Sequence, residues 1–247
     1  MANPPYQGTI YLDSGIITDK DATTFVSLTD AGRGERAMFD RRINSARKFN
    51  AFLFNVKFSD GLHAEVQVNP EFETVDAARA PAEKYARAIG QLPNVLRTRV
   101  NTVWIHQGVE PFGGGNNNIL IHVGQAELYQ RDGILEETLI HEASHTSLED
   151  HNFAAEWIEA QRRDNNFIST YAQQNPTRED VAESFLCYLA IRYLPDRISA
   201  ANTETIVRTI PNRIAYFDKQ NFQVYPLPPL PGNPFYMGRE HSPLEYV

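Results

Sequence analysis

The chain of 247 residues is 42% hydrophobic, which is enough to bury a sizeable core in one or two domains. Charged residues make up 22% of it, with 14 glycines and 15 prolines, and this composition excludes a collagenous, coiled-coil or wholly disordered protein. The formal net charge is −8 and no long basic block is present, so nucleic acid is not an expected partner.

The sequence indicates neither a membrane span nor a disulfide framework. No uninterrupted apolar run approaches the roughly 18 residues that a membrane span requires. The only cysteine, Cys187, cannot form an intramolecular disulfide, and the apolar residues around it indicate a buried core thiol. The first residues lack the charged and apolar regions of a signal peptide, so we expect either a cytoplasmic protein or a mature secreted form.

The first half of the chain is patterned for β-structure and one helix. Apolar residues alternate over 52–58 and 62–68 on either side of Ser59-Asp60-Gly61, which predicts an antiparallel hairpin. Thr74 precedes apolar residues at three- and four-residue spacing, so we expect a capped helix that kinks at Pro81.

Two short apolar runs, over 102–106 and 119–123, predict two further strands. The stretch 112–118 between them consists of Phe, Gly and Asn residues and predicts a loop. His106 and His122 fall in these strands, where we expect them to be structural rather than to contact a substrate.

The second half is patterned for helices, and a strand-rich part followed by a helical part indicates an α+β domain. Apolar periodicity predicts helices over 134–148, 153–163, 179–193 and 205–217. We expect one domain with a sheet lobe over 1–150, which includes the first of these helices, and a helical lobe over 151–222. A proline-rich segment over 223–247 is expected to pack on the body as a strap. Trp104 and Trp157 are expected to be core aromatics.

The stretch His141-Glu142-Ala143-Ser144-His145 lies inside the first of these predicted helices. A spacing of four residues places the two imidazoles one turn apart on one helix face, where both can bind the same zinc ion. Glu142, one position along the helix, can reach a water molecule beside that ion. The stretch therefore predicts two metal ligands and a general base.

This stretch resembles the HExxH signature on the active-site helix of the zincin metallopeptidases. The resemblance implies a zincin-like fold, in which a mixed sheet precedes the active-site helix and a helical lobe follows it. A catalytic zinc ion also needs a third protein ligand. His151 matches the metzincin spacing, but Leu148 occupies the glycine position of that pattern, where a positive φ costs a leucine about 1 kcal/mol or more.

The stretch 171–183 resembles the gluzincin pattern of lethal-factor-like and Pro-Pro-endopeptidase-like enzymes. In that pattern a tyrosine precedes a ligand glutamate at the start of a second helix, and another acidic residue follows one turn later. The resemblance makes Glu179 the third ligand, Tyr171 the hydroxyl that stabilises the oxyanion, and Glu183 a carboxylate that orients a ligand histidine. We favour Glu179 as the ligand and keep His151 and Glu183 as alternatives.

The function that this resemblance implies is that of a zinc-dependent endopeptidase. Glu142 would accept the proton of the attacking water and deliver it to the leaving amine. In zincins an extended peptide substrate pairs with an exposed edge strand beside the active-site helix, and the predicted strand from Ile119 to Val123 would take that place here. Two alternatives remain: a zinc hydrolase of a non-peptide amide or bacterial wall substrate, and a catalytically inactive zinc-binding interaction protein.

Overall fold

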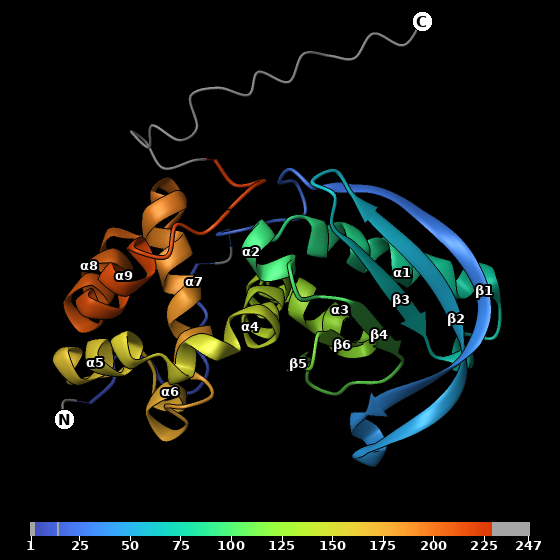
Figure 1. Cartoon of the computed structure of the whole chain (residues 1–247), viewed down its shortest axis with the longest axis horizontal. Coiled ribbons are helices and arrows are strands. Elements are labelled where there is room, and N and C mark those ends of the chain that lie inside the picture. The colour runs from blue at the N-terminus through green and yellow to red at the C-terminus, as the bar shows by residue number, and fades with distance from the viewer. Residues whose placement is uncertain (1–2, 14, 229–247) are drawn as a thin grey trace, which may run out of the picture.

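The computed structural model describes residues 3–13 and 15–228. Within these residues six strands form one mixed sheet in the order β1-β2-β3-β4-β6-β5, and the chain also forms nine α-helices (Figure 1). The predicted α+β class is therefore confirmed, whereas the division into lobes at residue 150 stays a prediction. No helix in this part of the chain is long and apolar enough to cross a membrane.

Three antiparallel strands form the outer part of the sheet: β1 (Phe25–Asp40), β2 (Ser45–Phe58) and β3 (His63–Val68). β2 and β3 are the predicted hairpin, with Phe54 opposite Val66. The sequence pattern does not predict β1, because most of its residues are exposed or half-buried and no apolar alternation marks it.

The inner strands are β4 (Thr102–His106), β5 (Gly113–Gly115) and β6 (Asn118–His122). β4 runs parallel to β3 and to β6, and both β4 and β6 coincide with predicted strands. β5 pairs antiparallel with β6 and is the last strand at this side of the sheet.

Two expectations for this region are wrong. The predicted loop over 112–118 contains β5, which a tight turn joins to β6; Asn116 and Asn117 form the turn, with φ of 49° and 59° in the left-handed region that asparagine tolerates. β6 therefore lies between two strands, and the edge strand is β5 instead of the predicted strand over 119–123. Glycines have low strand propensity, so the sequence of β5 does not indicate a strand.

Four helices lie between residues 75 and 148: α1 (Val75–Gly90), α2 (Asn94–Arg97), α3 (Val123–Arg131) and α4 (Leu135–Leu148). α1 begins at its predicted cap, where the Thr74 hydroxyl accepts a hydrogen bond from the backbone N–H of Ala77, and it contains Pro81. α4 is the predicted helix over 134–148, and it lies between β5 and the second group of helices (Figure 1). The sequence pattern does not predict α3.

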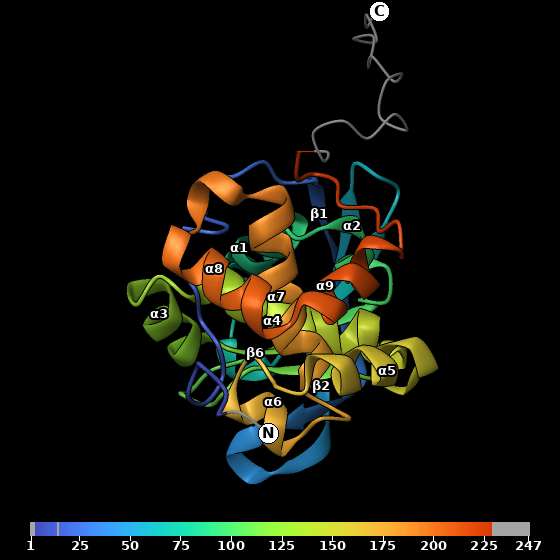
Figure 2. The same ribbon diagram turned by 90° about the vertical axis from the view of Figure 1, so that its left-hand side faces the viewer.

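The second group comprises α5 (Ala155–Asp164), α6 (Thr170–Gln174), α7 (Asp180–Tyr193), α8 (Ala200–Thr209) and α9 (Pro211–Asp218). In the view of Figure 2, which faces the helical side of the molecule, α8 and α9 lie in front of α7 and α4. The single helix predicted over 205–217 is wrong, because Pro211 begins a separate helix. Proline lacks the N–H that a continuous helix would need there.

A core between the sheet and the helices includes Trp157 and Cys187, both fully buried as predicted. Trp104 is only half-buried. It packs on the opposite face of the sheet, against a small cluster with Met38, and its indole N–H donates to Gln67. The predicted strap over 223–247 lies for the most part outside the described residues. The described start of it, residues 223–228, packs on α2 through backbone hydrogen bonds.

Candidate metal centre

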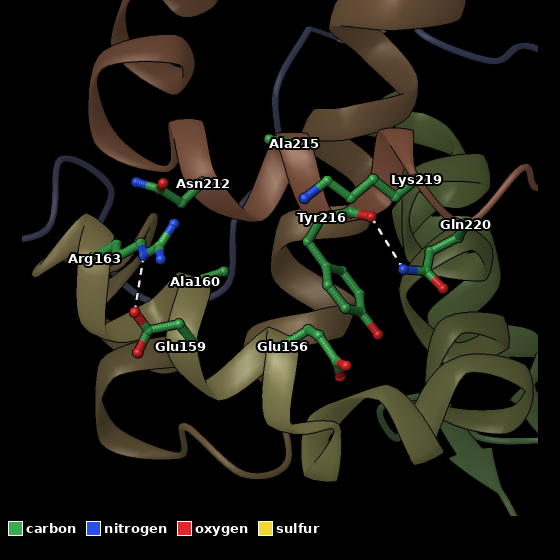
Figure 3. A pocket seen from close by; sticks show the side chains of 9 residues that line it. All are labelled: Glu156, Glu159, Ala160, Arg163, Asn212, Ala215, Tyr216, Lys219 and Gln220. Atoms are coloured by element: carbon green, nitrogen blue, oxygen red, sulfur yellow. Dashed lines mark hydrogen bonds and ion pairs between the residues drawn. The ribbon is translucent and has the colours of Figure 1, made fainter.

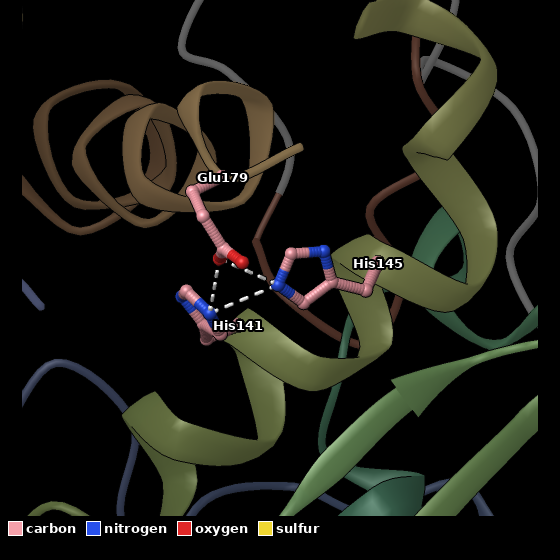
Figure 4. Close-up of side chains that lie close together, drawn as sticks. All are labelled: His141, His145 and Glu179. Atoms are coloured by element: carbon pink, nitrogen blue, oxygen red, sulfur yellow. Dashed lines mark hydrogen bonds and ion pairs between the residues drawn. The ribbon is translucent and has the colours of Figure 1, made fainter. Parts of the chain in front are cut away.

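Two helices bring three potential metal ligands together (Figure 4). His141 and His145 project from α4 one turn apart, and Glu179 directly precedes α7. Leu139 and Ile140 of α4 are fully buried, which fixes the rotation of the helix and directs both imidazoles toward Glu179. These are the two histidines and the third ligand that the sequence predicts.

The ligand atoms converge on one point. His145 Nε2 lies 3.1 Å from His141 Nε2 and 2.9 Å from Glu179 Oε2, and His141 Nε2 lies 3.4 Å from the same oxygen. Tetrahedral zinc ligands at roughly 2.0–2.1 Å from the ion are about 3.3 Å from one another, so this spacing fits a single ion. The histidine side chains are each 12% exposed and that of Glu179 is 3% exposed, which leaves the site shielded but reachable.

The two carboxylate oxygens of Glu179 have different surroundings. Oε1 accepts a hydrogen bond from the Tyr171 hydroxyl at 3.1 Å and lies 3.3 Å from Arg178 Nε. Oε2 is buried and has no well-formed hydrogen bond within the described chain, although it faces both imidazoles. A buried carboxylate oxygen without a donor is unusual in a folded protein, and a metal ion at this position would satisfy it.

The charge balance at the centre favours a cation. Burial raises the pKa of Glu179, but the two imidazoles outweigh burial and hold this pKa below its usual range, so the carboxylate is ionised. Burial lowers the pKa of His141, but the close contact with the Glu179 carboxylate and the charges of Glu142, Glu183 and Glu179 raise it above its usual value. Three carboxylates around two imidazoles are an environment that a divalent cation would neutralise.

Glu183 holds the far side of the His141 ring. Its Oε1 lies 3.4 Å from His141 Nδ1, so this nitrogen is the one that can carry the proton while Nε2 is left for a metal. Its Oε2 accepts two hydrogen bonds, from the backbone N–H of Ile10 at 2.9 Å and from the Ser169 hydroxyl at 2.6 Å. Burial raises the pKa of Glu183 to about 6, and the charge of His141 and these two donors oppose the rise.

Glu142 lies beside the ligands and next to β5. Its side chain is partly exposed and makes no ion pair or hydrogen bond with the described residues. The backbone of β5 packs directly on this turn of α4, because a Cβ added at Gly114 would overlap the carbonyl of Glu142. The Thr146 hydroxyl fixes the same contact by accepting from Gly115 N and donating to Asn118 O. The carboxylate of Glu142 is therefore unpaired within the described chain, on a turn of α4 that packs against the edge strand.

A buried ion-pair network anchors α7 next to the third ligand. Arg213 of α9 is fully buried, and its Nε and Nη1 lie 2.8 Å from Asp180 and 2.9 Å from Asp164. Asp180 directly follows Glu179, and Asp164 ends α5. The network thereby ties three helices together at the residue next to Glu179.

His151, the alternative ligand, is not part of the cluster. Its Nδ1 lies 2.5 Å from the hydroxyl of Tyr216 on α9, and its ring contacts Phe222. Of the residues that the structure describes, the group that could hold a metal consists of His141, His145 and Glu179.

His106 and His122 are both fully buried, as the predicted structural role requires. Their rings stack at 5.2 Å between centroids on neighbouring strands. His106 Nδ1 bonds to the Asn69 amide and His122 Nδ1 bonds to the Gln107 carbonyl, each at 2.8 Å. Burial lowers the pKa of both histidines, that of His106 to about 4, so both are neutral near pH 7.

A surface hollow of about 600 Å³ lies between α5 and α9 (Figure 3). Charged side chains line it, and one of them, Glu159, pairs with Arg163. Tyr216 is also in its wall. The hollow shares no residue with the group His141, His145 and Glu179.

The sequence does not indicate several groups that complete the centre. The Ile10 N–H is a backbone group on a distant segment, and no side-chain pattern can reveal it. Ser169 carries a local signal, since it is the N-cap of α6 and accepts from Ala172 N, but nothing in the sequence connects it with Glu183. Arg213 reaches Asp180 only through the packing of α9.

Comparison of the chain with protein-family models, curated proteins and solved structures gave no match. Any function assigned to it therefore depends on its own residues and their geometry.

Proposed function

We propose that this chain is a zinc-dependent endopeptidase. The observation that supports it is the convergence of His141 Nε2, His145 Nε2 and Glu179 Oε2 at spacings of 2.9 to 3.4 Å. Two imidazoles and one carboxylate are a donor set of catalytic zinc sites, which keep a fourth position open, whereas structural zinc sites have four protein ligands. Glu142 stands beside this donor set with its carboxylate unpaired within the described chain.

The proposal includes a zincin-like arrangement of the fold. The edge strand β5, the helix α4 with its HExxH stretch, and the helix α7 that follows the third ligand would correspond to the parts of a gluzincin active site. The contact of β5 with α4 and the position of Glu179 directly before α7 support this correspondence.

Each residue has a defined part in the proposed reaction. A bound zinc ion would polarise the scissile carbonyl and lower the pKa of a nearby water molecule. Glu142 accepts the proton of that water and passes it to the leaving amine. Tyr171 has its hydroxyl next to the ligand set, from which it can turn to donate to the developing oxyanion. Glu183 keeps the His141 ring in place.

The substrate would lie along β5. An extended peptide can add to a sheet edge through main-chain hydrogen bonds, with side-chain contacts giving specificity. β5 is such an edge and passes directly over Glu142. Its three glycines place no side chain between a bound peptide and the helix.

Glu142→Gln tests the proposal because it removes the base and keeps all three ligands. We expect this variant to bind zinc as the wild type does and to lose at least about 10²-fold in kcat. Digestion of an unstructured casein-like substrate measures the activity, and elemental analysis measures the zinc. Undiminished activity in a zinc-replete variant would contradict the mechanism.

The same assay separates the alternative functions. Cleavage of bacterial wall fragments without cleavage of casein-like protein would favour a wall hydrolase. Zinc binding without either activity would favour a zinc-binding interaction protein.

A further inference from the structure

The far end of the β1-β2 ribbon lies against the segment that leads into β5. A short 3-10 turn, Arg41–Ile43, joins the two strands there. Arg41 Nη2 donates a hydrogen bond of 2.7 Å to the carbonyl of Phe112, the residue directly before β5. A Cβ added at Gly113 would lie 3.0 Å from the same nitrogen. The guanidinium group of Arg41 is therefore in contact with the start of the edge strand.

Arg41 differs from its neighbour Arg42 in how its charge is balanced. Arg42 is paired with Asp40 at 2.7 Å and with Glu71 at 2.8 Å, so two carboxylates compensate it. Arg41 is exposed, and the one hydrogen bond that its side chain makes to another described residue goes to a neutral carbonyl. No carboxylate in the described part of the chain pairs with it. A guanidinium group has five N–H donors, so most of those of Arg41 remain for a ligand.

The Tyr129 side chain responds to the charges of both Glu142 and Arg41. The Tyr129 ring packs edge-on against Phe112 at 5.1 Å between centroids. Burial raises the pKa of Tyr129 and the charge of Glu142 adds to the rise, whereas a hydrogen bond with Gln125 and the charge of Arg41 oppose it. The Tyr129 hydroxyl thus lies within electrostatic reach of both Glu142 and Arg41.

The distance along β5 sets where Arg41 would meet a substrate. Gly114 is the residue of β5 that packs on Glu142, and Phe112, which Arg41 holds, is two positions earlier. Residues of a strand rise by about 3.3 Å each, so the guanidinium group, which contacts Phe112 and Gly113, stands roughly 3 to 7 Å along the edge from Gly114. Successive side-chain directions of a strand alternate between its two faces, so Arg41 lies on the face of β5 opposite α4. A peptide bound along β5 would present to it a side chain two or three residues from the scissile bond.

We propose that Arg41 is a specificity residue that recognises an acidic side chain, Asp or Glu, two or three residues from the scissile bond on the side toward Phe112. The inference rests on the proposed peptidase function and adds the chemical class of its substrate. Arginine and a carboxylate form paired, charge-assisted hydrogen bonds, which give geometric specificity as well as attraction.

Binding to the Glu142→Gln protein tests this inference without turnover. The probes are fluorescent peptides built on a sequence that the wild type cleaves in casein-like protein, with Glu or Gln at each of three positions on either side of the cleavage site. We expect the Glu peptide to bind about tenfold more tightly than its Gln partner at one of these positions. The preference should weaken as ionic strength rises.

Adding substitutions at Arg41 to the same protein completes the test. Arg41→Gln should abolish the preference, and Arg41→Glu should reverse it in favour of Lys at that position. Arg47→Gln, which removes an exposed arginine from the same ribbon, is the matched control and should leave the preference unchanged. Equal binding of all Glu and Gln pairs, or a preference that survives Arg41→Gln, would overturn the inference. A wild type that cleaves no peptide would instead overturn the proposed function.

Discussion

Glu183 shows how one buried residue can set the geometry of a candidate metal ligand, His141. It is fully buried on α7, and one of its oxygens faces His141 while the other accepts from Ile10 N and the Ser169 hydroxyl. The hydrogen bonds from Ile10 N and the Ser169 hydroxyl hold the Glu183 carboxylate in place, and the carboxylate in turn holds the His141 ring. Groups that orient metal-bound histidines in this way typically contribute 10-fold to 100-fold to metal affinity.

Glu183→Ala should therefore weaken zinc binding by about 10-fold to 100-fold while leaving all three ligands in place. Competition with a chromophoric chelator measures the affinity. Ser184→Ala is the matched control, because Ser184 is equally buried and its hydroxyl has no hydrogen-bond partner within the described chain. Equal zinc affinity of wild type and Glu183→Ala would show that His141 does not need this support.

At the residue scale, local spacing accounts for what the sequence predicts. The sequence predicts the placement of His141, Glu142 and His145, because residues four apart in a helix lie on the same face. Glu179 follows only from a resemblance, since it is far from them in sequence. Contacts such as Arg41 with Phe112 depend on how distant segments pack, and no local pattern encodes them.

At the scale of elements, strongly periodic segments are the ones that the sequence predicts. The β2-β3 hairpin, α1 and α4 all have clear apolar alternation or helical spacing. β5 is three glycines held by β6 and α4, so tertiary contacts create it against its own propensity. Pro211 indicates the break between α8 and α9, but the apolar periodicity alone does not show this break.

The ion pairs of Arg213 form a buried electrostatic link between helices. They join α9 to α5 and α7, and the two aspartate side chains, like that of Arg213, are 0% exposed. Removing one partner of a buried ion pair typically costs 3–5 kcal/mol, because the remaining charge is left uncompensated in a medium of low dielectric constant.

Arg213→Met should therefore lower the free energy of unfolding by about 3–5 kcal/mol, which urea denaturation measures. Arg208→Met, an exposed arginine on the neighbouring α8, should change it by no more than about 0.5 kcal/mol. If Arg213→Met lowered the free energy of unfolding by less than about 1 kcal/mol, the prediction would be contradicted. The attraction within the ion pairs would then only balance the cost of burying their charges.

At the scale of the whole molecule, the N-terminal segment links three helices that are far from it in sequence. The backbone N–H groups of Gly8, Ile10 and Leu12 donate in turn to Thr170 on α6, to Glu183 on α7 and to Glu137 on α4, at 2.8, 2.9 and 2.9 Å. The three donors are alternate residues of one short segment, which therefore reaches all three helices. It thereby links the helix that carries both histidines to the helix that follows Glu179.

Glu137 gives this link a pH dependence. Burial raises its pKa from 4.5 to about 7, with the Leu12 N–H opposing the rise and the charges of Asp13 and Glu136 adding to it. Between about pH 4.5 and 7 the folded protein binds more protons at Glu137 than the unfolded chain does. The free energy of unfolding should therefore fall as pH rises through this window, by on the order of 3 kcal/mol.

Glu137→Gln should remove that fall, since glutamine is neutral throughout and its amide oxygen can still accept from Leu12 N. Urea denaturation of the chelator-treated protein at pH 5, 6, 7 and 8 measures the effect. We expect the variant to be the more stable protein at pH 8 and close to the wild type at pH 5. Glu204→Gln, at an exposed position on α8, is the control and should show the same pH dependence as the wild type. A pH dependence of Glu137→Gln that is parallel to that of the wild type would contradict the prediction.

The most direct test of the metal centre is zinc stoichiometry by elemental analysis on the wild type, Glu179→Ala and His151→Ala, with proteolysis of casein-like protein measured on the same samples. The ligand geometry predicts about one zinc ion per chain and activity in the wild type and in His151→Ala, and loss of both in Glu179→Ala. Loss of zinc in His151→Ala but not in Glu179→Ala, or a wild type that binds no zinc, would contradict the account.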